Sequence, residues 1–501
     1  MADNQVSQTS SADTPASAAG SYNKNGLGVL ALAAIVVSSM LGGGIYPLPK
    51  KRAAGASAGA VLLAWLITGF GIYFIARTFS ILSMAKPDLK TGIYSYSRAG
   101  FGPYVGFTIG WSYWLCQVCG NVGYAVITMD ALNYFFPPYF AGGNNLASII
   151  GGSLIIWGFN YLVLRGVRQA SYINTIGTIV KIVPLVLFIL ILLFVFKFSR
   201  FDFDFWGEAV SAKVRLGGLS TQIKSTMLVT LWAFIGIEGA VVMSNRARTP
   251  GDVGKATILG FISCLAIYVL LSLLPFGYMS QAQLAAVPNP STAGVLEHIV
   301  GPWGAWLMNI GLLVSVLTSW LAWTMVTAEI PQAAAQNGTF PKAFTTENEN
   351  GSPSVSLWVT SSAMQLFLLL VYFSNNAWNT MLSITSVMVL PAYFASCAYL
   401  WKICEDGEYP DTMLTKRSTA LITSIIGSIY ALWLIYAAGL KYLMLAVVII
   451  ALGIPVYMWA RKENNPQGKA FTRGECILAS ALVIIAIAAI YGFSRGLISL
   501  N

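Results

Sequence analysis

Two charged residues lie inside long apolar stretches of this sequence. Lys181 occurs in Thr-Ile-Val-Lys-Ile-Val-Pro, and Glu238 occurs in Trp-Ala-Phe-Ile-Gly-Ile-Glu-Gly. A charge at the centre of a membrane helix costs about 2.5–3.5 kcal/mol on the most lenient scales, so it normally faces a partner or a cavity. Glu238 could attract a cationic ligand, carry a proton, or fasten helices through a Lys or Arg. Lys181 could act as a fixed ammonium, lose its proton during a cycle, or reach towards the membrane surface. We expect both residues to act in gating or coupling.

Glycine-rich interruptions occur in two of the apolar stretches. Gly42, Gly43 and Gly44 are consecutive, and a second interruption occupies residues 232–239. Each glycine costs a helix roughly 1 kcal/mol relative to alanine, so the triplet favours an unwound segment. Close packing of helices through small residues is the alternative for the triplet alone. The paired interruptions instead favour two broken helices, a pattern typical of the binding site of a membrane transporter.

An unwound segment presents backbone groups to a ligand. Amide N–H groups at the start of a half-helix favour an anion, so Gly43 and Gly44, with Gly42 beside them, could bind a carboxylate. Carbonyl groups freed near Ser39 and Ile235 could accept hydrogen bonds from an ammonium group. These two features together suit the head group of an amino acid.

Two tryptophans and two amides are candidates for the rest of the site. Trp232 adjoins the second interruption, and Trp323 lies in a later apolar run. An indole face attracts a guanidinium or ammonium group by roughly 0.5–2 kcal/mol. Most of the 15 tryptophans should serve packing or the membrane interface, so position must select the candidates; it supports Trp232, whereas Trp323 needs support from outside this pattern. Gln117 and Asn121 are one turn apart and could line the cavity, although an interhelical hydrogen bond explains Asn121 equally well.

Metal and redox chemistry are not indicated. Cys116 and Cys119 form a CxxC pattern, but they lie in an apolar run without a second pair, so packing is the better interpretation. The only histidine, His298, cannot assemble a metal site by itself. No nucleophile–base pair and no loop of catalytic-domain length is recognisable. We therefore expect no enzyme activity, no cofactor and no metal.

The composition sets the class of protein. Hydrophobic residues make up 56% of the 501 residues, charged residues only 10%, and the mean hydropathy is +0.69. Soluble proteins carry about 25% charged residues, so a soluble enzyme is nearly excluded. Six cysteines are too few for a disulfide-stabilised secreted scaffold. The net charge of +10 comes from short basic groups between apolar runs, which is typical of membrane-protein loops rather than of nucleic-acid binding. We predict an all-α polytopic protein whose surroundings are the lipid bilayer.

A helix needs roughly 20 apolar residues to cross a membrane. Thirteen runs qualify, near residues 27–47, 59–84, 104–136, 147–165, 172–197, 223–244, 255–278, 301–331, 355–373, 378–401, 419–438, 441–460 and 475–494. Lys and Arg are more frequent on the side that is inside if the N-terminus is cytoplasmic, although Lys50, Lys51 and Arg52 oppose this orientation.

The runs suggest four parts of the chain. Residues 1–25 are polar and predict a disordered cytoplasmic tail. Residues 26–200 and 201–402 would form two inverted repeats of five spans each, and residues 403–501 would add three C-terminal helices.

Several local motifs combine into a family resemblance. They are Gly-Gly-Gly-Ile-Tyr-Pro-Leu-Pro at 42–49, Gly-Ile-Tyr-Ser-Tyr at 92–96, Tyr-Trp at 113–114, Gly-Asn at 120–121, Trp-Ala-Phe-Ile-Gly-Ile-Glu at 232–238 and Ala-Ala-Ala-Gln-Asn-Gly-Thr-Phe-Pro at 333–341. From about residue 27 to 400 the chain resembles the amino acid–polyamine–organocation superfamily, close to its basic amino acid/polyamine antiporters and particularly to arginine–ornithine antiporters. This resemblance implies a 5+5 inverted-repeat fold in which helices one and six are broken.

The resemblance also implies roles for single residues. Gly43 and Gly44 would bind the substrate carboxylate, and Trp232 would be a gate over the bound substrate. Trp323 would stack on the cationic side chain of the substrate beside Asn121.

Tyr113 and Glu238 would form part of the gate on the cytoplasmic side. Lys181, near the middle of the membrane, would lie where sodium-coupled relatives hold a cation. Span ten would contribute a hydroxyl group. Its candidates are Ser383, Thr385 and Ser386. Gln117 departs from the family pattern, where a smaller residue adjoins the side-chain pocket.

The leading hypothesis is an antiporter of the cell (inner or plasma) membrane that exchanges arginine for ornithine by alternating access. Exchange of histidine for histamine or of lysine for cadaverine is the first alternative. Proton-coupled uptake, with Lys181 or Glu238 carrying the proton, is the second. A homodimer is what the resemblance suggests for the assembly.

Overall fold

The computed structural model describes residues 25–209, 215–373, 385–437 and 440–495. Among these residues the regular secondary structure is helical, and one isolated β-bridge joins Leu27 and Ala247. Within these described ranges, eleven helices are long and apolar enough to cross a membrane. The predicted all-α polytopic architecture is therefore confirmed.

The continuous helices keep the order of the predicted runs. They are α3 (Ala58–Ala85), α5 (Pro103–Leu132), α6 (Leu146–Leu164), α7 (Val167–Val195), α12 (Pro250–Leu273), α15 (Pro302–Gln336), α16 (Ser354–Val371), α18 (Leu390–Glu405), α19 (Arg417–Ala437), α20 (Leu440–Ala451) with α21 (Ile454–Asn464), and α22 (Arg473–Ser494). Shorter helices that the apolar runs did not predict lie between them: α4 (Gly92–Phe101), α8 (Phe198–Phe201), α13 (Gln281–Ala286) and α14 (Ser291–Val300).

Two further runs are broken into short helices, as the glycine patterns predict. The first consists of α1 (Val29–Met40), the 3₁₀ turn η1 (Gly43–Ile45) and α2 (Leu48–Gly55); the second consists of α10 (Leu219–Ala233), α11 (Gly239–Val242) and the 3₁₀ turn η3 (Met243–Arg246). With the continuous helices they account for all thirteen predicted runs, although the tenth begins outside the described residues.

Local sequence explains several helix starts. Gly102 has a φ of +94° directly before Pro103, so the chain can turn sharply between α4 and α5. Thr249 caps α12 by accepting a hydrogen bond from the Asp252 amide at 3.2 Å. These two starts show how residues in the connecting loops fix where α5 and α12 begin.

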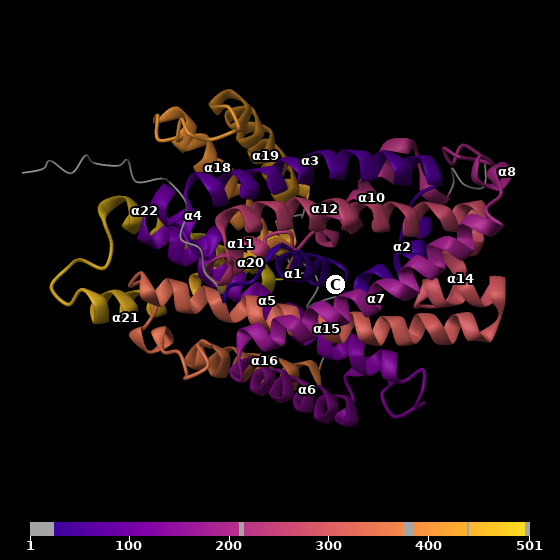
Figure 1. The fold of residues 1–501 in the computed structure, drawn as a ribbon, viewed down its shortest axis with the longest axis horizontal. Helices are drawn as coiled ribbons and strands as arrows, with labels where there is room; N and C mark the ends of the chain where they lie inside the picture. Colours follow the sequence, from indigo (N-terminus) through magenta and orange to yellow (C-terminus); the bar gives the residue numbers. More distant parts are fainter. Residues whose placement is uncertain (1–24, 210–214, 374–384, 438–439, 496–501) are drawn as a thin grey trace, which may run out of the picture.

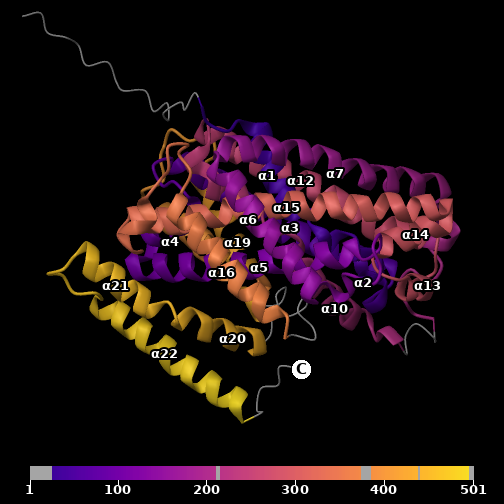
Figure 2. The same ribbon diagram turned by 90° about the horizontal axis from the view of Figure 1, so that it is seen from below.

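The two broken segments lie inside the bundle. α1 packs against α7, α12 and α15, and α11 packs against α1 and α12. Figure 1 shows α1 and α11 among the long helices α3, α12, α7 and α15. Figure 2 shows α20, α21 and α22 grouped at one side, away from α1. Long helices thus surround the non-helical backbone, as a membrane interior requires.

Candidate functional site

The first break lies between α1 and α2. α1 ends at Met40, and the backbone of Gly42 is extended, with φ −87° and ψ −162°. η1 then makes a single tight turn before α2 begins at Leu48. The break therefore frees carbonyl groups at the end of α1, where the helix dipole is negative.

The second break lies directly against the first. Gly236 has a φ of +112°, a conformation that only glycine adopts without strain. A Cβ atom there would lie 2.6 Å from Ser39 Cβ, so the absence of a side chain lets the two breaks touch. The meeting of two interrupted segments, expected from the sequence, is present in the structure.

Lys181 of α7 is fully buried and points at the first break. Its Nζ donates hydrogen bonds to Ser38 O at 3.2 Å, Leu41 O at 3.0 Å and Ser319 Oγ at 3.1 Å. These acceptors are enough for the three protons of an ammonium group. Lys181 therefore does not reach the membrane surface, which removes one of its three interpretations.

Hydroxyl groups on α15 and α12 also bind the freed carbonyls. Ser315 Oγ donates to Leu41 O at 2.8 Å, and Ser319 Oγ lies 2.5 Å from Ser38 O. Tyr268 Oη lies 2.6 Å from Met40 O and 2.7 Å from Ala233 O, so one hydroxyl is shared by the two breaks. Sequence analysis missed these three residues. The one-turn spacing of Ser315 and Ser319 was the only available signal.

Glu238 is the corresponding group at the second break, and it is also fully buried. Its carboxylate accepts hydrogen bonds from Tyr113 Oη at 2.9 Å, Tyr393 Oη at 2.6 Å and the Gly236 amide at 3.0 Å. Its hydrogen-bond partners are hydroxyl and amide groups, rather than the Lys or Arg of the helix-fastening interpretation. Tyr393 was missed because it lies 155 residues away in sequence.

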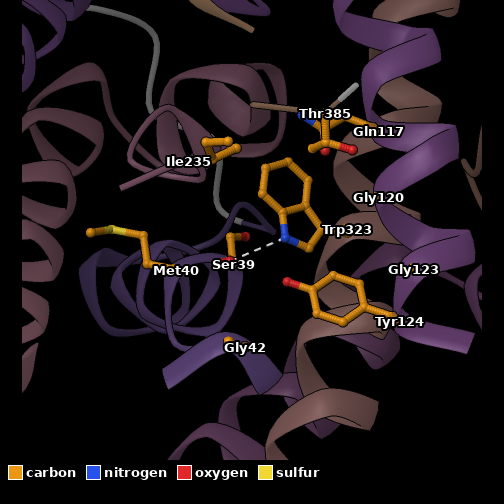
Figure 3. Close-up of a pocket in the computed structure, with 11 residues that line it drawn as sticks. Ser39, Met40, Gly42, Gln117, Gly120, Gly123, Tyr124, Ile235, Trp323 and Thr385 are labelled. Atoms are coloured by element: carbon orange, nitrogen blue, oxygen red, sulfur yellow. Dashed lines mark hydrogen bonds between the residues drawn. The ribbon is translucent and has the colours of Figure 1, made fainter. Parts of the chain in front are cut away.

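A cavity of about 60 Å³ lies beside the breaks. Figure 3 shows it enclosed by side chains of several helices, with the indole of Trp323 next to Tyr124. Its lining consists of Ser39, Met40, Gly42, Gly44, Gln117, Gly120, Gly123, Tyr124, Ile235, Trp323 and Thr385. None of these described lining residues is charged. The structure thus brings together most of the predicted binding residues.

The indole of Trp323 is hydrogen-bonded to one of the backbone carbonyl groups that were expected to bind a ligand. Its Nε1 donates a hydrogen bond to Ser39 O at 3.1 Å, as Figure 3 shows. The cavity of about 60 Å³ is far smaller than the ~300 Å³ of typical ligand sites. The site is therefore closed in this conformation, and Trp323 holds the carbonyl that an ammonium group would need.

Three predicted binding residues lie elsewhere. Gly43 lines a different cavity, because its position faces Ile127 and Val316. Asn121 is buried outside the lining, and its Nδ2 donates to Thr327 Oγ1 of α15 at 3.3 Å, so the interpretation as an interhelical hydrogen bond describes its position. The side chain of Trp232 lies outside the part of the chain that the structure describes.

Among the candidate hydroxyls of span ten, Thr385 lines the cavity, and its Oγ1 donates to Cys116 O at 3.1 Å. Ser386 does not line it, and Ser383 is outside the described residues. Tyr124 is an addition that the sequence did not indicate. A Cβ at Gly42 would lie 2.6 Å from Tyr124 Oη, so this tyrosine packs directly on the first break.

Cysteines and histidine take structural positions. Cys116 and Cys119 are buried free thiols, and His298 Nδ1 lies 2.7 Å from Gly294 O. Within the described ranges no group of three or more His, Cys, Asp or Glu side chains could hold a metal ion.

Comparisons with known proteins place the chain in a family. Residues 27–460 match the model of the amino acid permease family. An arginine/agmatine antiporter of Chlamydia pneumoniae is 62% identical over 475 residues, which are 95% of this chain and 98% of that protein. Arginine/agmatine antiporters of Chlamydia abortus and of Chlamydia trachomatis serovar L2 are 60% and 59% identical, each over 95% of this chain and 98% of the relative. The chain is therefore a multi-pass membrane protein that belongs to the amino acid permease family of transporters, as its motifs and its two broken helices predict.

Proposed function

We propose that this protein exchanges arginine for agmatine by alternating access at the cavity between its two breaks. The names of its relatives support antiport of a cationic amino acid, and they favour agmatine over ornithine as the exchanged product. Exchange of arginine for ornithine, the leading hypothesis from the sequence, becomes the second candidate.

The observation that carries this proposal is an uncharged cavity formed where two unwound segments meet. Gly42 and Gly44 line it from the first break, and Ile235 lines it from the second. Such backbone groups suit a carboxylate and an ammonium group. Trp323 and Gln117 supply an aromatic face and an amide for the side chain of the substrate. A desolvated cation is attracted by an indole face without needing a carboxylate.

Arginine and agmatine share a guanidinium group that ornithine lacks. Agmatine lacks the α-carboxylate, whereas ornithine keeps the amino acid head group and lacks the guanidinium. A site that holds arginine and agmatine and disfavours ornithine must therefore anchor the guanidinium. We assign this contact to Trp323 and Gln117, with Thr385 beside them.

Lys181 acts in this proposal as a fixed ammonium, and Glu238 as part of the cytoplasmic gate with Tyr113 and Tyr393. The hydrogen bonds from Lys181 Nζ to Ser38 O and Leu41 O support the fixed charge, because they use the protons of the ammonium form. Opening requires that the Trp323–Ser39 hydrogen bond break and that the cavity widen. We further propose an inner-membrane location, a cytoplasmic N-terminus and assembly as a homodimer.

Counterflow in proteoliposomes tests the proposal. Vesicles loaded with agmatine and diluted into labelled arginine should accumulate label, while vesicles without internal substrate should not. Parallel loading with ornithine, cadaverine or histamine should give much slower uptake. Faster uptake with ornithine would favour arginine/ornithine exchange. Accumulation driven by a pH gradient in substrate-free vesicles would favour proton-coupled uptake.

Trp323→Leu should weaken arginine and agmatine exchange by an order of magnitude or more, because a desolvated cation–aromatic contact contributes about 2 kcal/mol. Trp323→Phe keeps an aromatic face and loses only the Nε1 hydrogen bond to Ser39, so it should retain most of the affinity. Trp306→Leu, at an exposed tryptophan of the same helix, is the matched control. Unchanged half-saturation constants in Trp323→Leu would remove this residue from the site.

A further inference from the structure

A second cavity lies on the α2 side of the first break. Its volume is about 590 Å³, and it is lined by Gly43 and Ile127, whereas Gly42 and Gly44 line the first cavity. A Cβ at Gly43 would lie 2.7 Å from both Ile127 Cδ1 and Val316 Cγ2. Tight packing at Gly43 therefore forms a wall between the two cavities. The predicted orientation of the chain places the second cavity outside, and we call it the vestibule.

Two side chains of opposite charge line the vestibule. Lys51 comes from α2, and Asp130 comes from the last turn of α5. Asp130 is exposed, and its Oδ1 accepts a hydrogen bond from the Gly142 amide at 3.1 Å. The vestibule therefore combines an ammonium group that suits a carboxylate with a carboxylate that suits a guanidinium group.

A buried amide adds a second acceptor. Asn309 of α15 lines the vestibule and is 2% exposed. Its Nδ2 donates to Ala305 O at 2.9 Å, but its Oδ1 has no hydrogen-bond partner among the described residues. A buried amide oxygen without a partner is costly, so this atom is available for a donor from a ligand.

Arginine and agmatine differ at the end that Lys51 would meet. Both carry a guanidinium group, but arginine adds a carboxylate beside its ammonium group, and agmatine has the ammonium group alone. A positive side chain attracts the first head group and repels the second. At a partly exposed site such a charge changes the affinity by roughly five-fold to ten-fold.

We propose that Lys51 and Asp130 make the vestibule a selectivity site that accepts external arginine and disfavours the return of released agmatine. The inference rests on the proposed arginine/agmatine exchange and adds a direction to it. Asp130 attracts the guanidinium group of either substrate, and Lys51 distinguishes the two head groups. Exchange is thereby biased towards entry of the amino acid and exit of its decarboxylation product.

Exchange kinetics in right-side-out membrane vesicles test the proposal, with saturating internal arginine and labelled external arginine or agmatine. Lys51→Gln should raise the external half-saturation constant for arginine and lower that for agmatine, so that their ratio changes about ten-fold. Asp130→Asn should raise both constants to a similar degree. Because the effect is electrostatic, high salt should shrink it.

Lys50→Gln is the matched control. It removes the same charge from the neighbouring position on α2, but Lys50 does not line the vestibule, and its backbone hydrogen bond to Ser291 Oγ is retained. Lys51→Arg keeps the charge and should keep the wild-type ratio. A wild-type ratio in Lys51→Gln would overturn the vestibule inference while leaving exchange intact. Absence of arginine/agmatine exchange in the wild type would overturn the proposed function instead.

Chemical restoration of the charge at position 51 tests whether this position is reached from outside the membrane and whether the sign of its charge sets the preference. In a Cys476→Ser background, which removes the exposed cysteine, Lys51→Cys should behave like Lys51→Gln. Treatment from outside with a membrane-impermeant trimethylammonium methanethiosulfonate should restore the wild-type preference for arginine. The sulfonate analogue should shift the preference further towards agmatine. Equal effects of the two reagents, or no effect of either, would contradict the assignment.

Discussion

The two breaks of this protein are stabilised by groups of opposite charge. At the first break, the end of α1 leaves carbonyl groups unpaired, and Lys181, Ser315 and Ser319 donate hydrogen bonds to them. At the second break, the Gly236 amide donates to the Glu238 carboxylate. The exposed end of a half-helix decides which kind of partner is needed, because its carbonyl end is negative and its amide end is positive.

This difference separates the proposed roles of the two buried charges. Among the described residues, Lys181 donates hydrogen bonds to groups at or beside the first break, so its charge is suited to fixing a backbone conformation. Glu238 binds Tyr113 of α5 and Tyr393 of α18, so its charge links three separate segments. A link between segments can open and close, which suits a gate. Tyr268 is the hydroxyl that touches both breaks.

Lys181→Met should have the largest effect among substitutions at the breaks. Hydrogen bonds from a buried charged group contribute about 1.5–3 kcal/mol, so the exchange rate should fall about hundredfold. The measurement is arginine counterflow together with thermal stability in detergent. Lys416→Met, at an exposed lysine between α18 and α19, is the control. Wild-type exchange in Lys181→Met would show that Ser315 and Ser319 suffice to hold the first break.

Glu238→Gln should have an intermediate effect. The amide keeps one acceptor oxygen, but its NH₂ group faces hydrogen-bond donors that now bind the carboxylate. Turnover should therefore fall about tenfold, which corresponds to a rise of about 1.4 kcal/mol in the activation free energy. The half-saturation constant for arginine should change little, because Glu238 does not line the cavity. Initial rates of exchange over a range of arginine concentrations separate the two parameters.

Glu408→Gln is the matched control for Glu238→Gln. Glu408 is an exposed glutamate that pairs with Lys86 at 2.9 Å, and this hydrogen bond lowers the pKa of the Glu408 carboxyl. The pair therefore stabilises the fold only at pH values above the pKa of Glu408, and the contribution is lost as the pH falls through it. Glu408→Gln should leave turnover unchanged at neutral pH. An equal loss in both variants would mean that Glu238 has no special role.

Tyr268→Phe should have the smallest effect. It removes one neutral hydroxyl, which contributes about 1 kcal/mol, so exchange should slow about fivefold. Because the hydroxyl touches both breaks, its loss should be non-additive with Lys181→Met in a double-mutant cycle. Tyr278→Phe, which removes a hydroxyl that donates to His298 O, is the control. Strict additivity would show that the breaks are not coupled through Tyr268.

Some features of the site were predictable because they depend on neighbours in the chain. The glycine triplet and the Gly236 region predicted both breaks, since backbone propensity is local. The apolar runs predicted the spans, and the intramembrane charges marked Lys181 and Glu238. Ser39 was anticipated from the first break, Gln117 from its one-turn spacing with Asn121, and Trp323 from the resemblance, and all three line the cavity.

Other features depend on helices that are distant in sequence. Tyr393, Tyr268 and Ser319 reach the breaks only after the bundle packs, and nothing near them in the sequence indicates their partners. Tertiary packing also turned Gly43 away from the cavity and selected Thr385 among the candidate hydroxyls.

The sequence by itself thus determined that the protein spans a membrane and where two of its helices unwind, because hydrophobicity and glycine content act locally. Only the tertiary structure decided which side chains complete the freed backbone groups and which charges share a vestibule. Those partners come from separate helices, and their meeting depends on how the whole bundle packs.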